Sequence, residues 1–257
     1  MKQLIAMLCL CTIAFTVQAQ TEINQTIPAN GVTSADLNFE YADVTIKTWD
    51  KSEIQITGTI SVNKGKDDDA FEMDVDKKNG RVSISTSVDN SSMYNSVWTK
   101  KNNKIKSISE NKTNDCDSEI YGSHIENTLV IMLPKNIKLK SSSIYGSTKV
   151  EGFTTNISIE NTYGSVDAVA KNVKNVNSIN LSSIYAPVDL SIPSTAKADM
   201  ELNTEFGQIY SDIDMQINTN RSMHKKMFGE NIISTLNGGG IKIKLASNYS
   251  KIYVRET

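Results

Sequence analysis

The strongest constraint on the fold is an internal repeat of about twenty residues. Four segments align on an aromatic residue followed by a small one: Ile144-Tyr145-Gly146-Ser147, Thr162-Tyr163-Gly164-Ser165, Ile184-Tyr185-Ala186-Pro187 and Glu205-Phe206-Gly207-Gln208. Apolar residues recur six positions before the aromatic, as at Ile157, and three positions after it, as at Val166. A fixed period of this length is typical of proteins in which each repeat is one unit stacked on the next.

The repeat predicts short strands joined by a corner. The positions six and four before the aromatic share parity with the aromatic itself, so on one strand these side chains are expected to point the same way. The apolar position three residues after the aromatic has the opposite parity, and a small residue lies between the two. This change of parity predicts a bend at the small residue. The chain has 29 Ile against 12 Leu, and β-branched residues favour strands. We therefore predict an all-β fold, a single-stranded β-helix or β-solenoid with coils of about 20 residues. A β-sandwich is the alternative, less favoured because Asn-Gly and Asp-Gly hairpin turns are scarce.

Weaker copies of the pattern extend the repeat toward both ends of the chain. Their corners would be Tyr41-Ala42-Asp43, Asn79-Gly80-Arg81, Gly238-Gly239-Gly240 and Tyr249-Ser250-Lys251, the last of these closing the chain. Between the copies, 17 of the 29 positions in 90–118 are Ser, Asn or Lys, which predicts a long polar loop. The run 129–133 predicts a buried strand that ends at Pro134, and 223–229 is expected to be a loop or a short helical turn.

The N-terminus has the pattern of a signal peptide. Lys2 precedes an apolar run from Leu4 to Val17, and Ala19 completes a small-residue cleavage site before Gln20. The apolar run is too short to span a bilayer, and no later segment is apolar enough to do so. We expect residues 1–19 to be removed and residues 20–257 to form one exported domain in the periplasm, on the outer cell surface or secreted. Cys116 would then be the remaining cysteine, which excludes an internal disulfide.

Two sets of residues are candidates for a site. The first is the aromatic column of the repeat, for which shared parity with Ile and Leu predicts a stacked ladder inside the protein with a structural role. Carbohydrate stacking is the competing interpretation, which the absence of a hydroxyl at Phe206 disfavours. The column consists of Tyr145, Tyr163, Tyr185 and Phe206.

The second candidate lies in the polar loop. Met93, Tyr94 and Trp98 occur there among Ser, Asn and Lys, a mixture that suits adaptable recognition around an aromatic anchor. An insertion without a binding role is the alternative for this loop.

Catalytic, metal and nucleic-acid functions lack a supporting motif. The acids of the repeats, among them Asp167 and Asp189, are judged to share no column, and neither His124 nor His224 has a partner acid at a recognisable spacing. Nucleophile-elbow, zinc-site and phosphate-loop motifs are absent from the sequence. The acidic clusters match no known calcium loop and are expected to be solvated charge; they lie at 67–69, 115–119 and 212–214. A formal net charge of −2 argues against nucleic-acid binding. We predict no enzymatic activity, no metal and no cofactor.

The sequence resembles the putative adhesin family of exported bacterial proteins. The matching elements are Tyr41-Ala42-Asp43-Val44-Thr45-Ile46 followed by Trp49, the Leu133-Pro134 strand end, the serial Tyr-Gly repeats and Asn237-Gly238-Gly239-Gly240-Ile241. The resemblance covers nearly all of the chain after the signal peptide except 90–118, and it implies a β-helix at the cell envelope similar to auto-transporter adhesin head domains. It supplies no catalytic residues.

These observations together predict an adhesin-like binding protein at the envelope or cell surface, which presents a solenoid surface to protein or glycan partners. A structural or sensing periplasmic protein without an adhesive role is the first alternative, and a polysaccharide-active β-helix enzyme is the second. Since open ends of a solenoid are exposed sheet edges, we expect them to be capped by the termini or by homo-oligomerisation.

Overall fold

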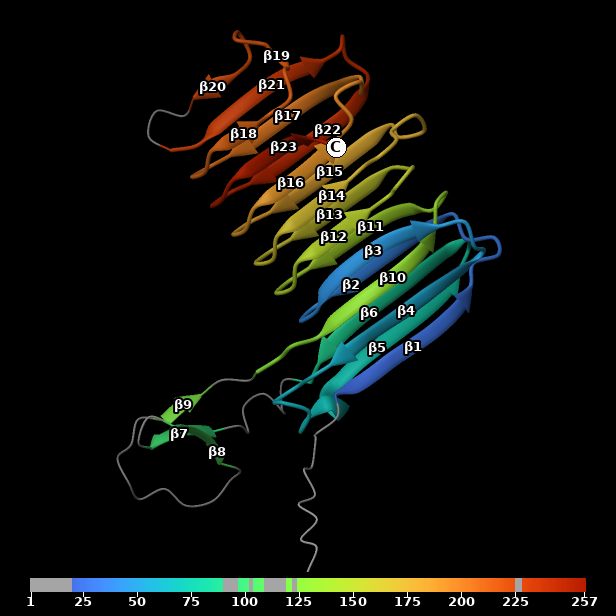
Figure 1. The fold of residues 1–257 in the computed structure, drawn as a ribbon, viewed down its shortest axis with the longest axis vertical. Helices are drawn as coiled ribbons and strands as arrows, with labels where there is room; N and C mark the ends of the chain where they lie inside the picture. Colours follow the sequence, from blue (N-terminus) through green and yellow to red (C-terminus); the bar gives the residue numbers. More distant parts are fainter. Residues whose placement is uncertain (1–19, 90–96, 102–103, 109–118, 122–123, 225–227) are drawn as a thin grey trace, which may run out of the picture.

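A computed structural model of the chain describes residues 20–89, 97–101, 104–108, 119–121, 124–224 and 228–257. These residues form strands in two large sheets and one small sheet, with one short 3-10 turn at Asp68–Ala70 (Figure 1). The prediction of an all-β fold is therefore confirmed, and the two open sheets agree with the sandwich alternative.

We name the two large sheets A and B. The order of strands in sheet A is β1 (Thr21–Pro28), β4 (Glu53–Ile60), β10 (Thr128–Pro134), β3 (Asp43–Trp49), β12 (Thr148–Glu151), β14 (Val166–Val169), β16 (Val188–Ile192), β23 (Ile252–Glu256) and β18 (Ile209–Ser211). The order in sheet B is β19 (Gln216–Ile217), β21 (Glu230–Leu236), β17 (Ala198–Thr204), β22 (Ile241–Ser247), β15 (Ser178–Ser183), β13 (Ile157–Asn161), β11 (Lys138–Ser143), β2 (Ser34–Phe39), β6 (Arg81–Val88) and β5 (Phe71–Lys78), with β20 (Met223–His224) paired to β21.

The central repeats alternate between the two sheets. Each contributes one strand to sheet B and the next to sheet A, as β13 and β14 do, and successive repeats pair in parallel. Ile157 pairs with Ile179, and Val166 pairs with Val188, so the positions six before and three after the aromatic align between repeats as predicted. The strand predicted before Pro134 is β10, which ends at that proline.

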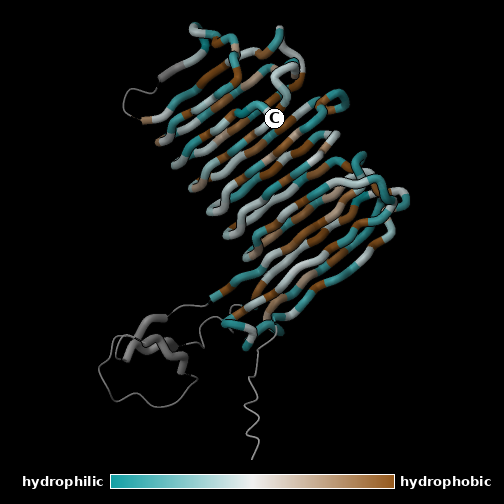
Figure 2. The backbone as a smooth tube through the Cα atoms, viewed as in Figure 1, coloured by the Kyte–Doolittle hydropathy of each residue, from teal (hydrophilic) through white to brown (hydrophobic). Residues whose placement is uncertain are grey.

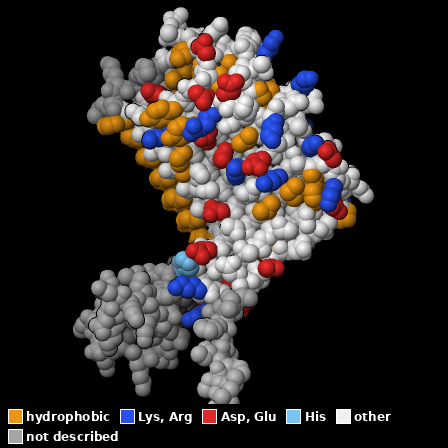
Figure 3. Space-filling model, in the orientation of Figure 1, with side chains coloured by type: hydrophobic (Ala, Val, Ile, Leu, Met, Phe, Trp, Pro, Cys, Tyr) orange, Lys and Arg blue, Asp and Glu red, His pale blue; other side chains and the backbone are white. Residues whose placement is uncertain are grey.

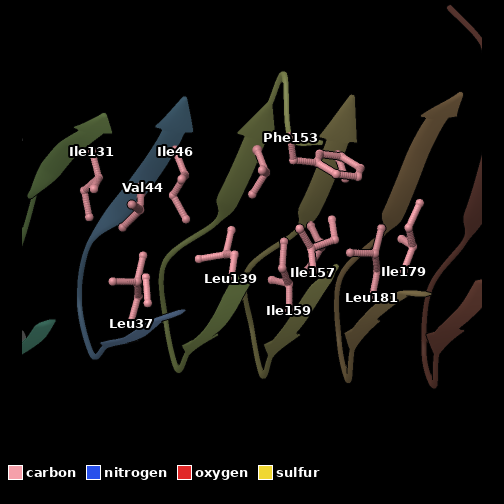
Figure 4. Packing of buried hydrophobic residues seen from close by; sticks show 14 of the residues in the cluster. Leu37, Val44, Ile46, Ile131, Leu139, Phe153, Ile157, Ile159, Ile179 and Leu181 are labelled. Carbon is pink, nitrogen blue, oxygen red and sulfur yellow. The ribbon is translucent and has the colours of Figure 1, made fainter. Parts of the chain in front are cut away.

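The core lies between the sheets, where inward side chains from both form one hydrophobic cluster. Apolar and polar residues alternate along the central strands of both large sheets (Figure 2), so these strands bury one face and expose the other. Ile46 and Ile131 of sheet A face Leu37 of sheet B across this core (Figure 4). Buried aliphatic side chains of this kind supply the main stabilisation of the fold.

The N-terminal end of the sheets is built from antiparallel pairs. β5 pairs with β6 through a turn at Asn79 and Gly80, whose φ angles are 53° and 74°, and β1 pairs with β4. Positive φ at both positions is typical of a two-residue hairpin turn. The sequence copy at 79–81 is therefore a hairpin and not a coil of the repeat, which corrects that prediction.

The C-terminal copies do not stack in sequence order. β22 lies between β15 and β17, and β23 lies between β16 and β18, so the last copy inserts between two earlier ones instead of closing the stack. The copy at 238–240 is no coil either, since the strand before it, β21, runs antiparallel to β17. Sequence similarity between copies does not encode their spatial order.

The region predicted as a polar loop contains strands. β7 (Val97–Lys101) pairs with β8 (Lys104–Ile108) and with β9 (Glu119–Tyr121) in a small antiparallel sheet, in which Trp98 lies opposite Ile120. The loop candidates Met93 and Tyr94 lie outside the described residues, as do Cys116 and the expected signal peptide 1–19. Met223–His224 is strand β20, which corrects the loop or helical turn expected over 223–229 for these two residues, while 225–227 lie outside the described residues.

Candidate functional site

An aromatic ladder follows the corners of the repeats. Neighbouring rings stack with centroids 4.6 Å apart for Tyr41 and Tyr145, 5.1 Å for Tyr145 and Tyr163, and 4.9 Å for Tyr163 and Tyr185. The stack then continues through Tyr249 to Phe206, and Phe228 packs on Phe206 with its ring tilted by 36°. In the described chain the aromatic ladder consists of Tyr41, Tyr145, Tyr163, Tyr185, Tyr249, Phe206 and Phe228.

The ladder lies on the surface, so the predicted interior placement is wrong. Tyr145 is 51% exposed, Tyr163 and Tyr185 are 50% exposed, and Phe206 is 55% exposed. The reason is that β11 ends at Ser143, two residues before Tyr145, and the chain bends at 144–146. Strand parity therefore ends before the aromatic residue, which turns outward at the corner. The ring stacking was predictable, but the direction of the side chains was not.

A buried polar column holds the corners from inside. The residue two positions before the aromatic is buried and polar at five corners, at Ser143, Asn161, Ser183, Thr204 and Ser247. The Gly146 N–H donates to Ser143 Oγ at 3.1 Å, and Ser183 Oγ donates to the Gly164 carbonyl at 2.9 Å. Buried groups of this kind are costly when unpaired, so these hydrogen bonds fix the corner geometry. Each of these five corners thus has a polar residue inside and an aromatic ring outside.

Asn161 makes the fullest set of these contacts. Its Nδ2 donates to the carbonyls of Ser165 at 2.9 Å and Gly146 at 3.3 Å, and its Oδ1 accepts from Thr148 Oγ1 at 3.2 Å. The asparagine therefore joins its own corner to that of the preceding repeat, to which Gly146 belongs.

Small residues after the aromatic allow the corners to approach closely. A Cβ on Gly164 would lie 1.9 Å from the carbonyl oxygen of Gly146, and one on Gly146 would lie 1.7 Å from that of Ala42. Neither glycine has a positive φ, so each is required for close packing and not for a left-handed turn. This close approach accompanies the short ring spacing of the ladder.

The outer edge of the ladder is an apolar surface. Ile144 and Ile184 flank the rings with 43% and 40% of their surface exposed, and Figure 3 shows hydrophobic side chains gathered in a row along one edge of the molecule. Contiguous exposed apolar surface of this kind marks interaction sites in soluble proteins. The faces of rings within the stack are covered by their neighbours, so ring edges, tyrosine hydroxyls and flanking isoleucines remain for a partner.

Sequence reasoning found only part of the ladder. Tyr41 and Tyr249 occur in the weaker copies and could have been added by alignment, since both follow the same corner pattern. Phe228 had no such signal, because the segment around it interrupts the repeat; it packs on Phe206 at 5.9 Å and extends the ladder.

Two acids that were judged to share no column do share one. Asp167 of β14 pairs in register with Asp189 of β16 on the outer face of sheet A, which corrects that judgement. Arg255 Nε lies 3.0 and 2.8 Å from the two carboxylate oxygens of Asp189, and Lys149 Nζ lies 4.0 Å from Asp167. The two carboxylates are therefore embedded in ion pairs.

The ionisation of this group is set by its neighbours. Burial raises the pKa of Asp167, and a hydrogen bond from Lys149 lowers the pKa of Glu151. The same hydrogen bond to Glu151 raises the pKa of Lys149. The ionised form is thus favoured at Glu151 and disfavoured at Asp167 on the same face of sheet A.

The remaining predicted candidates take part in local contacts. His124 Nε2 lies 3.1 Å from a carboxylate oxygen of Glu126, an acid partner that sequence spacing did not reveal. Asp68 accepts hydrogen bonds from the backbone N–H groups of Thr21 and Val62, and Asp212 accepts one from that of Glu256. Within the part of the chain that the structure describes, no three His, Cys, Asp or Glu side chains gather to hold a metal ion.

Comparisons with known proteins show the fold. The chain is similar to the crystal structure of a putative cell adhesion protein from Clostridium sporogenes, with a TM-score of 0.59, 14% sequence identity, and coverage of 93% of this chain and 100% of that one. A putative adhesin from Bacteroides fragilis matches with a TM-score of 0.32 and 12% identity over 93% of this chain and 99% of that one. No protein-family model and no curated protein matches the chain. At 14% identity the first match shows a shared fold and nothing more.

No helix among the described residues is long and apolar enough to cross a membrane.

Proposed function

We propose that the chain is a non-enzymatic, adhesin-like protein of the cell envelope or surface, which presents the aromatic ladder to a protein partner. The observation that carries the proposal is that the central aromatic residues are each about half exposed along one continuous edge. Tyr163, for example, is 50% exposed. Tyrosine and phenylalanine are enriched in the buried centres of protein interfaces, where they supply large contact area at low entropic cost.

The architecture that supports this function is a β-solenoid of about twenty residues per coil. Parallel pairing supports it, since β11, β13, β15 and β22 are successive neighbours in sheet B and β12, β14, β16 and β23 are successive neighbours in sheet A. A polypeptide that visits the two sheets in turn and pairs in parallel with itself follows a coil. We extend the proposal to a single domain over 20–257.

A protein partner fits the ladder better than a glycan does. A sugar ring stacks on an aromatic face, but the faces of Tyr145 and Tyr163 are parallel within 2° and cover each other. The apolar flanks at Ile144 and Ile184 offer nothing to sugar hydroxyls, whereas they can pack against apolar side chains of another protein.

A paired set of variants tests the proposal. Tyr163→Ser with Tyr185→Ser removes two central rings, while Tyr210→Ser removes an exposed tyrosine that stacks on Tyr253 away from the ladder. The purified proteins are compared by surface plasmon resonance against a panel of extracellular-matrix and envelope proteins. We expect binding of a panel member by the wild type and by Tyr210→Ser, and a loss of at least about tenfold in the double variant. Equal binding by all three proteins would show that the ladder is not the contact surface.

The location and the adhesive role are tested in cells. Export fits the signal peptide predicted at 1–19, and the similar protein from Clostridium sporogenes is described as a putative cell adhesion protein. Protease treatment of intact cells would remove a surface protein and spare a periplasmic one. Complete protection would favour the structural or sensing role over adhesion.

One observation favours the polysaccharide-active alternative, the register pairing of Asp167 with Asp189. Two carboxylates on one face are the minimum for glycoside hydrolysis. Release of reducing ends from a glycan panel by the wild type, abolished in Asp167→Asn, would establish that activity in place of a purely binding role.

A further inference from the structure

The outer face of sheet B is hollowed along its length, on the side away from the core. A hollow of about 490 Å³ lies over β17, β21 and β22, one of about 450 Å³ over β13, β15 and β22, and one of about 190 Å³ over β2, β11 and β13. Glu201 and Lys244 line both of the first two, and Ser158 and Asn180 line both of the last two. The three hollows therefore form one continuous trough, which we name the sheet B trough.

The floor of the trough is periodic because the strands are in register. One outward row crosses six neighbouring strands through residues that pair in turn: Asp36, Lys140, Ser158, Asn180, Lys244 and Glu201. Neighbouring strands lie about 4.8 Å apart, which is close to the length of one sugar unit in an extended polysaccharide. A linear polymer laid across the strands would thus meet one outward side chain per repeating unit.

Ionic groups in the trough largely neutralise each other. Lys242 Nζ lies 2.7 Å from a carboxylate oxygen of Asp199, and Lys244 Nζ lies 3.3 Å from one of Glu201. Arg81 lies 3.8 Å from Asp36. The other charged residues that line the trough are Lys138 and Lys140 of β11, Glu160 of β13 and Arg221, which leave a surplus of two positive charges along the lining. A surplus this small suits a neutral polymer better than a strongly charged one.

The middle of the trough offers unused hydrogen-bonding groups. The side chains of Ser158, Asn180 and Ser182 are partly exposed, and none makes a side-chain hydrogen bond to another described residue. Serine hydroxyls and asparagine amides both donate and accept, as sugar hydroxyls do. None of the described residues that line the trough is aromatic. Its large apolar residues, such as Ile159, Leu181 and Leu245, are buried in the core, apart from Ile217 and Ile233 at the β21 end.

From the period, the charge balance and these free groups we infer that the sheet B trough binds a neutral linear polysaccharide across its parallel strands. This site is separate from the aromatic ladder, which lies at the corners between the sheets. The chain would therefore contact a glycan through a sheet face and a protein through an edge.

Calorimetry with defined oligosaccharides tests the inference. The probes are linear hexamers of glucose, mannose and N-acetylglucosamine, the corresponding dimers, and a galacturonate hexamer as an anionic comparison. We expect at least one neutral hexamer to bind, with affinity at least about tenfold above its dimer because the longer chain meets more strands. Raising the salt concentration should change this affinity little.

Matched variants locate the site. Ser158→Ile and Asn180→Ala remove hydrogen-bonding groups from the trough, and each should weaken binding about tenfold. Ser191→Ile makes the same change on a partly exposed residue of β16 in sheet A, and binding should be unchanged. Circular dichroism checks that all three variants fold.

Several results would overturn the inference. These are no heat from any neutral hexamer, tighter binding of the galacturonate hexamer than of every neutral one, or equal losses in Ser158→Ile and Ser191→Ile. Failure here would leave the proposed protein partner of the ladder intact, because the trough variants do not alter that edge. Conversely, the Tyr163→Ser and Tyr185→Ser double variant should still bind the hexamer.

Discussion

Truncation of Tyr163 to alanine should destabilise the protein measurably without preventing it from folding. The ring stacks on Tyr145 and Tyr185 at centroid distances of 5.1 and 4.9 Å, and each stacked pair contributes about 0.5–1.5 kcal/mol beyond area burial. Half of the residue's surface is buried, so the lost burial adds about 1 kcal/mol, half of a typical large apolar side chain. We expect the free energy of unfolding to fall by about 2–4 kcal/mol.

Urea unfolding followed by circular dichroism measures this loss, with Tyr163→Phe as the control. The Tyr163 hydroxyl makes no hydrogen bond to another described residue, so the control should lie within about 0.5 kcal/mol of the wild type. A double-mutant cycle with Tyr145→Ala should give a coupling energy of about 0.5–1.5 kcal/mol. Two results would refute the reasoning. An alanine variant as stable as the control would mean that the stacking contributes nothing, and a variant that cannot fold would mean that the ring is part of the core.

Four further substitutions probe the turns and the outer face of sheet A. Gly164→Ala should lower the free energy of unfolding by about 1–3 kcal/mol or more, because its Cβ would lie 1.9 Å from a backbone oxygen of Gly146. Gly238→Ala has open space around its Cβ but a φ of +84°, and should lower it by about 1–2 kcal/mol. A larger loss for Gly238→Ala than for Gly164→Ala in thermal denaturation would contradict the close-packing role of Gly164. Asn161→Ala removes two hydrogen bonds to corner carbonyls and should cost about 2–4 kcal/mol in chemical denaturation. Burial raises the pKa of the Asp167 carboxyl above its ordinary value of 3.8, so folding favours its protonated form and the wild type loses stability as the pH rises through the folded-state pKa. Asp167→Asn cannot ionise and should therefore be more stable than the wild type at neutral pH. The gain should vanish below about pH 3.8, and a gain that persists in acid would point to a cause other than ionisation.

The sequence predicted which side chains of each strand point inward better than it predicted where the strands end. Ile157, Ile179 and Val166 took the inward positions assigned to them, because alternation within a strand depends only on local geometry. Parity failed at Tyr163 because the strand ended before that residue, and strand ends depend on hydrogen bonds to a neighbouring repeat that sequence spacing does not reveal.

The candidate site was predictable to a similar degree. The central rings were identified and their stacking expected, but their exposure depends on the bend after β11, β13 and β15. The pairing of Asp167 with Asp189 was available from the alignment, since both lie four residues after their aromatic residue. The sheet B trough was not predictable, because a hollow depends on how neighbouring strands and the β19–β20 segment are placed in space.

The position of the last copy links the ladder to the stability of the C-terminal end. Tyr249 lies between Tyr185 and Phe206 in the stack, at 5.1 Å from each, although it follows both in the sequence. β22 lies between β15 and β17, and β23 lies between β16 and β18, so the last residues occupy a gap between earlier repeats. Their contacts with these strands are long-range in the sequence, and long-range contacts carry a larger loop-closure cost than local ones. The continuous edge of the aromatic ladder therefore depends on the last residues of the chain as well as on the central repeats.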